Sequence, residues 1–270
     1  MTGTASMLQR QASVIIPLIR REVAGRYRGS SLGLLWSLIT PLFMLGVYTF
    51  VFGFVLKTRW SAPSGDGVDH STTEFAVVLF AGLMVFQLFS EVITRAPTLI
   101  LANRNYVKKI VFPIEILPIV ALGAALFHVG VSLVVLLLFV FGVFGAIPWT
   151  VVLAPVVLLP LVLLMLGLSW FLAAIGVYFR DISQFIAPLM TALMFLSPIF
   201  FPRSSMPEWL QDVMFLNPLT VPVEAMRAVV VFGEQPAWMA LAVYTVVGGV
   251  VMIVGQQFFQ LTRRGFADVL

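Results

Sequence analysis

Arginine is concentrated in one short stretch near the N-terminus, and its guanidinium group is well suited to paired hydrogen bonds with phosphate. Residues 7–28 carry five arginines, and on a helical projection the apolar residues fall on one arc. The side opposite that arc carries Arg10, Arg21 and Arg28. This pattern predicts an amphipathic helix at the cytoplasmic membrane surface, its arginines facing lipid headgroups or a partner protein, although a basic flank that only sets topology is the alternative. Arg26 falls on the apolar arc, and Pro17 is expected to split the helix or begin its second half.

A second basic stretch lies between Pro97 and Pro113. Residues 98–110 are expected to form a short helix, suited by its basic residues and Tyr106 to dock into a groove on a cytosolic protein. Membrane topology alone explains the lysines equally well. It does not explain the apolar residues 99–101, which are expected to lie against a protein surface.

Aromatic side chains offer a third kind of chemistry, because their faces stack on the C–H surfaces of sugars without fixing one geometry. Trp36, Phe43 and Phe50 are seven residues apart, which places them on nearly one face of a helix. Such a stripe suits a pore for a sliding polymer. Packing against lipid or protein is the alternative, and it is the expected role of most of the 24 phenylalanines.

Catalytic motifs are not found in the sequence. It has no cysteine, no Gly-Lys-Ser/Thr phosphate loop and no His-Glu-x-x-His pair, so neither an enzyme nor a metal site is expected. Glu91 and Glu115 fall near predicted span ends, which leaves His128 as the deep ionisable residue. We expect a neutral imidazole bonded to a neighbouring helix there rather than a proton relay, because no deep carboxylate partner is evident.

The elements that position these residues are membrane helices. The chain is 60% hydrophobic and 10% charged, and residues 116–179 contain no Asp, Glu, Lys or Arg. Such a run is long enough for two spans, with a turn expected at 142–148. Six spans are predicted, at residues 32–56, 75–94, 116–141, 150–179, 182–201 and 237–260, after a cytoplasmic segment at 1–31.

The basic residues predict the orientation of these spans. With the N-terminus inside, 12 of the 16 Lys and Arg residues are cytoplasmic, and the four outside are Lys57, Arg59, Arg203 and Arg227. Both termini are therefore expected in the cytoplasm. Residues 203–236 are too polar and proline-rich for a span, and short helices that dip part-way into the bilayer are expected there.

Five segments, taken in order, resemble one known family. They are RYRGSSLGLLWSLITPL at residues 26–42, VKKIVFPIEILP at 107–118, VYFRD at 177–181, FLSPIFFP at 195–202 and LNP at 216–218 followed by Glu224 and Arg227. Together they resemble the membrane subunit of type-2 ABC exporters, specifically the polysaccharide-export permeases of the Wzm, KpsM and TagG kind. Ile114 and His128 depart from this family, whose members often carry Arg or Lys at the first position and Asp at the second.

The resemblance implies an all-α integral membrane protein with six transmembrane helices, an N-terminal interface helix and re-entrant helices between spans five and six. It also implies a homodimer with two cytosolic ATPase subunits, which would bind ATP and Mg²⁺, so no cofactor is expected in this chain. The coupling helix at 98–110 would contact the ATPase through Asn103, Arg104, Asn105, Tyr106, Lys108 and Lys109. The re-entrant segment at 203–234 would narrow the outer exit, with Asn217, Pro218, Glu224 and Arg227 as its candidate residues.

The implied function is ATP-driven export of a lipid-linked polysaccharide, such as O-antigen, across the bacterial cytoplasmic membrane. Substrate phosphates would be held by Arg20, Arg21, Arg26 and Arg28. The polymer would then slide past Trp36, Phe43, Tyr48, Phe50, Phe195 and Phe200. Two alternatives remain: an exporter of a small amphiphile or drug, which needs no continuous aromatic pore, and a membrane scaffold that needs no ATPase. No nucleic-acid partner is expected.

Overall fold

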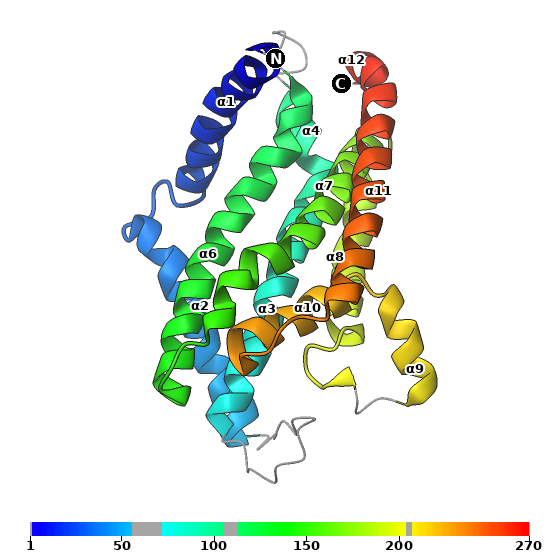
Figure 1. Ribbon diagram of the computed structural model, residues 1–270. Coiled ribbons are helices and arrows are strands. Elements are labelled where there is room, and N and C mark those ends of the chain that lie inside the picture. Colours follow the sequence, from blue (N-terminus) through cyan, green and yellow to red (C-terminus); the bar gives the residue numbers. More distant parts are fainter. Residues whose placement is uncertain (1, 56–71, 105–112, 204–206, 270) are drawn as a thin grey trace.

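The computed structural model describes residues 2–55, 72–104, 113–203 and 207–269, and these ranges form helices and turns without a β-strand. Figure 1 shows a bundle of long helices, which are α1 (Thr2–Arg26), α2 (Trp36–Tyr48), α3 (Thr72–Arg95), α6 (Leu117–Phe144), α7 (Ala154–Tyr178), α8 (Ile182–Leu196) and α11 (Trp238–Thr262). Shorter segments extend or connect them: η1 (Gly33–Leu35), η2 (Thr49–Val55), η3 (Ala96–Thr98), α4 (Leu99–Ala102), η4 (Ile114–Ile116), η5 (Trp149–Leu153), α9 (Glu208–Val213), η7 (Met214–Leu216), α10 (Thr220–Arg227), η8 (Ala228–Phe232), η9 (Arg263–Gly265) and α12 (Phe266–Val269).

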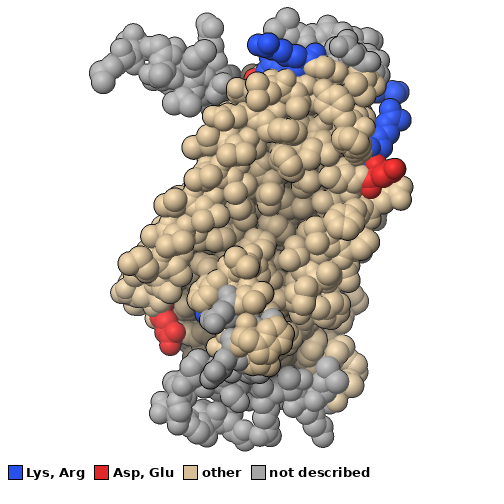
Figure 2. Space-filling model, turned by 90° about the vertical axis from the view of Figure 1, so that its right-hand side faces the viewer, with Lys and Arg blue, Asp and Glu red and all other residues tan. Residues whose placement is uncertain are grey.

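Within the described residues, five helical stretches are long and apolar enough to cross a bilayer. They are Gly33–Phe52, Thr73–Ala102, Ile114–Phe144, Trp149–Tyr178 and Trp238–Gly265, and they correspond to five of the six predicted spans. Figure 2 shows a broad uncharged band across one face of the molecule, with charged side chains toward its two ends. The prediction of an all-α membrane protein is confirmed.

The predicted fifth span differs from its expected length. Helix α8 has 15 residues, which is about 22 Å at 1.5 Å per residue and shorter than a hydrocarbon core of about 30 Å. The helix ends because Pro198 lacks an N–H group and restricts the preceding Ser197 to extended backbone, where ψ is 154°. Residues 182–201 therefore contain one shorter apolar helix and an irregular continuation, and a sixth complete span stays a prediction.

The direction of the helices brings the two ends of the chain together. Helices α2, α6 and α8 run away from the end of the bundle that holds the start of α1, and α3, α7 and α11 run back toward it (Figure 1). The start of α1, α4 and α12 consequently lie at the same end, which agrees with the predicted placement of both termini on one side. The turn expected at 142–148 is confirmed, since Gly145 ends α6 with a φ of 74°, a left-handed conformation that favours glycine.

Helix α3 lies at the centre of the main core, which joins it to α6, α7, α8 and α10. Almost all of its side chains from Phe75 to Ile93 are buried, which explains why this span is apolar on every face. Helices α7 and α11 approach closely through glycines: a Cβ at Gly255 would meet the carbonyl oxygen of Gly167. Helix α10 lies nearly across the long helices toward the other end of the bundle (Figure 1).

Candidate functional site

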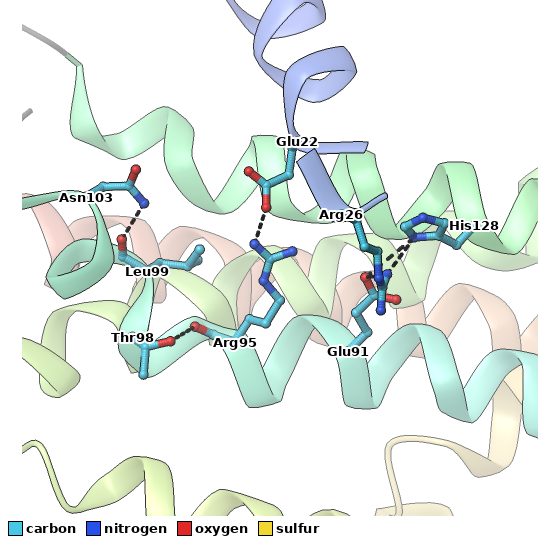
Figure 3. A network of polar contacts seen from close by, with 8 residues as sticks. All are labelled: Glu22, Arg26, Glu91, Arg95, Thr98, Leu99, Asn103 and His128. Atoms are coloured by element: carbon cyan, nitrogen blue, oxygen red, sulfur yellow. Dashed lines mark hydrogen bonds and ion pairs between the residues drawn. The ribbon is translucent and has the colours of Figure 1, made fainter. Parts of the chain in front are cut away.

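Two ion pairs join α1 to α3 with their charges exchanged. On α1 the acid Glu22 precedes the base Arg26 by four residues, and on α3 the acid Glu91 precedes the base Arg95 by four. Arg95 Nη2 pairs with Glu22 Oε1, and Arg26 Nη1 lies 2.6 Å from Glu91 Oε1. Figure 3 shows the two pairs side by side between the helices. Residues four apart share a helix face, so each helix presents one acid and one base to the other.

His128 of α6 completes this network. Its Nδ1 lies 2.9 Å from Arg26 Nη1 and 3.6 Å from Glu91 Oε1 (Figure 3). The side chains of Glu91 and His128 are 20% and 15% exposed, whereas that of Arg26 is 49% exposed. Arg26 therefore contacts both the Glu91 carboxylate and the His128 imidazole, and the arginine is the member that remains accessible.

This network shows that the expected lack of a carboxylate near His128 is wrong, and it explains why Arg26 falls on the apolar arc of α1. A carboxylate partner for His128 does exist in Glu91, because the packing of α3 against α6 brings the two together. The imidazole does contact side chains of neighbouring helices, as expected. The position of Arg26 on the apolar arc of α1 also has a cause, since that arc packs on α6 and α3 and the arginine meets an acid there.

Helix α1 is continuous from Thr2 to Arg26, so the expectation that Pro17 splits the helix or begins its second half is wrong. Pro17 lies inside α1. The helix runs beside the first half of α6 (Figure 1). The side chain of Ile19 fills the position that a Cβ at Gly123 would occupy. A flat glycine surface on α6 thus lets α1 pack closely against it.

The other candidate arginines lie on the outer side of this region. Arg20, Arg21 and Arg28 are exposed. Arg20 and Arg21 line an open hollow of about 340 Å³ on α1, together with Ile16, Pro17 and Ala24. The surface of the hollow is almost entirely apolar.

The predicted coupling residues fall partly outside the described residues, namely Asn105, Tyr106, Lys108 and Lys109. Asn103 ends α4 and donates from Nδ2 to the carbonyl oxygen of Leu99 across 2.9 Å, and Arg104 is exposed. The apolar run at 99–101 does lie against a protein surface, but that surface is this chain's own helix α7. The run is therefore no longer an argument for a partner protein.

Helix α4 is firmly connected to the long helices below it. Ile100 is fully buried in a cluster with Trp170 of α7 and Phe259 of α11. A Cβ at Gly176 of α7 would meet the carbonyl oxygen of Pro97, so η3 also lies close to α7. The start of the predicted coupling helix is therefore packed on α7 and α11.

The candidate pore aromatics divide into two groups. Trp36, Phe43 and Phe50 are exposed along α2 and η2, with Phe43 65% exposed, so the predicted stripe is uncovered by this chain. Tyr48 is partly buried against the core. Phe195 stacks on Phe200 at 5.6 Å between ring centroids.

The aromatic contacts also include Phe52, which was not among the predicted pore residues. Phe52 of the π-helical segment η2 stacks on Phe200 at 5.9 Å and contacts Phe75 of α3 at 5.7 Å. A π-helical turn within an apolar helix is not visible in the sequence pattern, and such turns are frequent at functional sites. The rings thereby connect the first span with the end of α8.

The candidate exit residues hold the short helices together. Asn217 donates from Nδ2 to the carbonyl oxygen of Leu196, and its Oδ1 accepts from the backbone N–H of Leu219. The carbonyl oxygen of Pro218 accepts from Tyr244 of α11 across 2.6 Å. Burial raises the pKa of the half-buried Glu224 carboxyl, against the opposing effect of Arg203 and Arg227.

Arg227 is the most deeply placed of these residues, with 3% of its surface exposed. It donates to the carbonyl oxygens of Val78, Pro198 and Ile199 across 3.0, 2.6 and 2.6 Å. The oxygens of Pro198 and Ile199 lie in the irregular segment after α8, where backbone groups have lost helical partners, and that of Val78 lies within α3. The side chain therefore stabilises the break at Pro198 and points into the protein rather than toward an open exit.

Comparisons with known proteins agree with this architecture. The family described as ABC-2 type transporter matches residues 13–231. The chain is 29% identical to the O-antigen export system permease protein RfbA of Myxococcus xanthus, over 97% of this chain and 96% of that protein. It is 24% identical to the Klebsiella pneumoniae protein of the same name, over 95% of each, and 28% identical to the polysialic acid transport protein KpsM of Escherichia coli, over 88% and 90%.

Proposed function

The chain belongs to the ABC-2 type transporter family, and we propose on that premise that it is the membrane permease of an ATP-driven polysaccharide exporter. The observation that carries the proposal is the match along nearly the whole chain to permeases named for O-antigen and polysialic acid transport. The five helices of membrane-spanning length in the described part of the chain agree with this role. The proposed location is the bacterial cytoplasmic membrane, with both termini in the cytoplasm.

The energy source in this proposal is a separate pair of ATPase subunits that bind ATP and Mg²⁺. They dock on the segment from Asn103 to Lys109, which follows α4 in the sequence, and α4 lies at the end of the bundle that also holds the start of α1 and α12 (Figure 1). The burial of Ile100 against α7 and α11 gives a mechanical route from this segment into the long helices. Closure of the ATPases then moves those helices.

The proposed substrate is a lipid-linked polysaccharide whose phosphate is recognised by arginine. Arg20 and Arg21 line the hollow on α1, and Arg26 and Arg28 follow toward the start of α2. Guanidinium groups pair with phosphate through two parallel hydrogen bonds, so these arginines suit the headgroup of such a lipid.

The proposed path lies between two copies of the chain. The aromatic side chains of α2 and η2 that this chain leaves uncovered face the second copy, and Phe195 and Phe200 of the α8 region continue the aromatic surface. Broad ring faces allow a polymer to slide, because stacking does not require one fixed register. The segment held by Asn217 and Arg227 closes the outer end.

Reconstitution of the purified permease with its ATPase in lipid vesicles tests this proposal. Labelled lipid-linked glycan supplied on the ATPase side should reach the opposite side when ATP is added, and it should not do so with an ATPase that binds ATP without hydrolysing it. Movement of small labelled amphiphiles without glycan movement would contradict the proposal. An inactive complex in which ATP hydrolysis does not depend on the permease would contradict it as well.

A further inference from the structure

Arg26 forms an anion site that the protein fills with its own carboxylate. Glu91 Oε1 lies 2.6 Å from Arg26 Nη1, and the same Nη1 donates to Nδ1 of the neighbouring His128 across 2.9 Å. These residues come from α1, α3 and α6, so the site exists only when α1 is packed against the other two helices (Figure 3). We propose that Glu91 is an internal substitute for phosphate, which a lipid-borne phosphate displaces from Arg26, and that this displacement releases the C-terminal end of α1. The inference deepens the proposed function and rests on it for the source of the phosphate.

The accessibility of the three side chains favours an exchange at Arg26. About half of the Arg26 side chain is uncovered, whereas Glu91 and His128 are mostly enclosed. An incoming anion therefore reaches the guanidinium group without entering the helix interface. Phosphate presents three oxygens to the guanidinium fork, and charge-assisted pairing with it is at least as strong as with a carboxylate.

His128 provides a partner for the carboxylate that is left behind. In the present arrangement Nδ1 accepts from Arg26, which places the ring proton on Nε2, and Nε2 has no hydrogen-bond partner among the described residues. When Arg26 leaves, the neutral tautomer with its proton on Nδ1 can donate to Glu91. The carboxylate then remains hydrogen-bonded, and no net proton is taken up or released.

The attachment of α1 explains how a local exchange would move a helix. The contacts that hold this part of α1 include Ile19 against Gly123, the Glu22–Arg95 pair and the Arg26–Glu91 pair. The Arg26–Glu91 pair lies at the C-terminal end of the helix, before the loop that leads into η1 and α2. Loss of this pair weakens the attachment of α1 to α3 and α6, so the contact between Ile19 and Gly123 should open more often.

Binding of phosphatidic acid provides a direct test. The full chain is placed in phosphatidylcholine nanodiscs, and a fluorescent phosphatidic acid is titrated as the probe. Glu91→Gln removes the competing charge and keeps the side-chain size, so the affinity for the probe should rise about threefold to fivefold, as expected from removing a partly exposed ion pair. The gain should vanish in the double variant Glu91→Gln/Arg26→Gln.

Glu22→Gln is the matched control, because it removes the other carboxylate between α1 and α3 and leaves Glu91 on Arg26. Its affinity for phosphatidic acid should stay within twofold of the unsubstituted protein. An equal gain in Glu22→Gln and Glu91→Gln would overturn the proposal, since it would reflect only the loss of negative charge. An unchanged affinity in Glu91→Gln would overturn it as well.

The movement of α1 is measured separately by disulfide cross-linking. The chain has no cysteine, so Ile19→Cys/Gly123→Cys forms a single pair at the contact between α1 and α6. Phosphatidic acid should slow its oxidation at least threefold relative to phosphatidylcholine alone, and Glu91→Gln should slow it without phosphatidic acid. Equal rates under all conditions would show that α1 does not move. Soluble pyrophosphate at the same phosphate concentration should have a smaller effect, and an equal effect would exclude the lipid as the source.

These results are separable from those on export. If glycan export depends on Arg26 but phosphatidic acid does not change the rate of cross-linking, the proposed function is supported and the anion exchange is contradicted. If the complex exports no glycan but Glu91→Gln raises the affinity for phosphatidic acid in an Arg26-dependent way, the anion exchange is supported and the export of polysaccharide is contradicted.

Discussion

The guanidinium group of Arg227 donates to the carbonyl oxygen of Ile199 across 2.6 Å and so joins α10 to the irregular segment after α8. The same side chain reaches Pro198 and Val78, which makes it a connection among three parts of the chain. A helix that breaks inside a membrane protein leaves carbonyl oxygens without partners, and a buried arginine supplies several donors at once.

Replacement of Arg227 by methionine should destabilise the protein by about 2–4 kcal/mol, because three buried carbonyl oxygens lose a charged donor. Arg227→Lys should recover only part of the loss, since a single ammonium group cannot match the spread of the guanidinium fork. Thermal unfolding in detergent micelles measures both. A methionine variant as stable as the original protein would mean that other groups satisfy these oxygens.

Gly82 of α3 should tolerate no side chain, because a Cβ there would lie 2.7 Å from Arg227 Nη2. Gly82→Ala is expected to lower stability by about 1–3 kcal/mol through displacement of the arginine. Gly130→Ala is the control, since a Cβ at Gly130 of α6 meets nothing within 4 Å and alanine favours the helix. Equal unfolding temperatures for the two variants would argue against this packing.

Arg26→Glu should place two carboxylates together beside His128 and lower both stability and glycan export. The exchanged double variant Arg26→Glu/Glu91→Arg restores an ion pair between α1 and α3 and should recover the unfolding temperature. Export should stay at least tenfold reduced, because an arginine on α3 does not offer its charge to a phosphate at α1. Recovery of export in the double variant would assign Arg26 a purely structural role.

Charge reversal of Arg104, Lys108 and Lys109 together should abolish the stimulation of ATP hydrolysis by substrate and leave the permease folded. The segment would no longer fit the partner surface that we propose for it. Arg180→Glu, in the exposed turn between α7 and α8 at the same end of the bundle, is the control and should keep the stimulation. Retained coupling in the triple variant would limit these residues to setting topology.

Single cysteines introduced into this cysteine-free chain can report its topology. A membrane-impermeant maleimide applied to intact cells should label Ser64→Cys, in the predicted outer loop. It should label Lys108→Cys and Leu270→Cys only after the cells are opened. Labelling of Lys108→Cys from outside would reverse the proposed docking side.

The long helices were predictable because they depend on local composition. The charge-free run at 116–179 is long enough for two spans, however these helices pack. Gly145 and Pro148 mark the turn between the two spans. The length of α8 was harder to predict, although Pro198 was visible. Proline also lies inside α1, α2, α7 and α8 without ending them, and at Pro198 the break is stabilised by Asn217 and Arg227 from later in the chain.

The polar network was visible in the sequence only as separate exceptions. Arg26 on an apolar arc, Glu91 near the end of a span and His128 within another each invited an explanation, but only the packing of three helices shows that they explain one another. The apolar run at 99–101 was correctly predicted to lie against a protein surface, but Ile100 is buried by α7 and α11 of the same chain. The sequence shows that such residues need a surface, but it does not show which chain provides that surface.

The exchanged charges on α1 and α3 also bear on the biosynthesis of the protein. Both partners of each ion pair, Glu22 with Arg95 and Arg26 with Glu91, precede residue 96, so they leave the ribosome before α6 is made. The growing chain can neutralise the two charges of α3 in pairs as that helix enters the bilayer. His128 arrives later and joins a pair that already exists, so the order of synthesis matches the order in which these charges need partners.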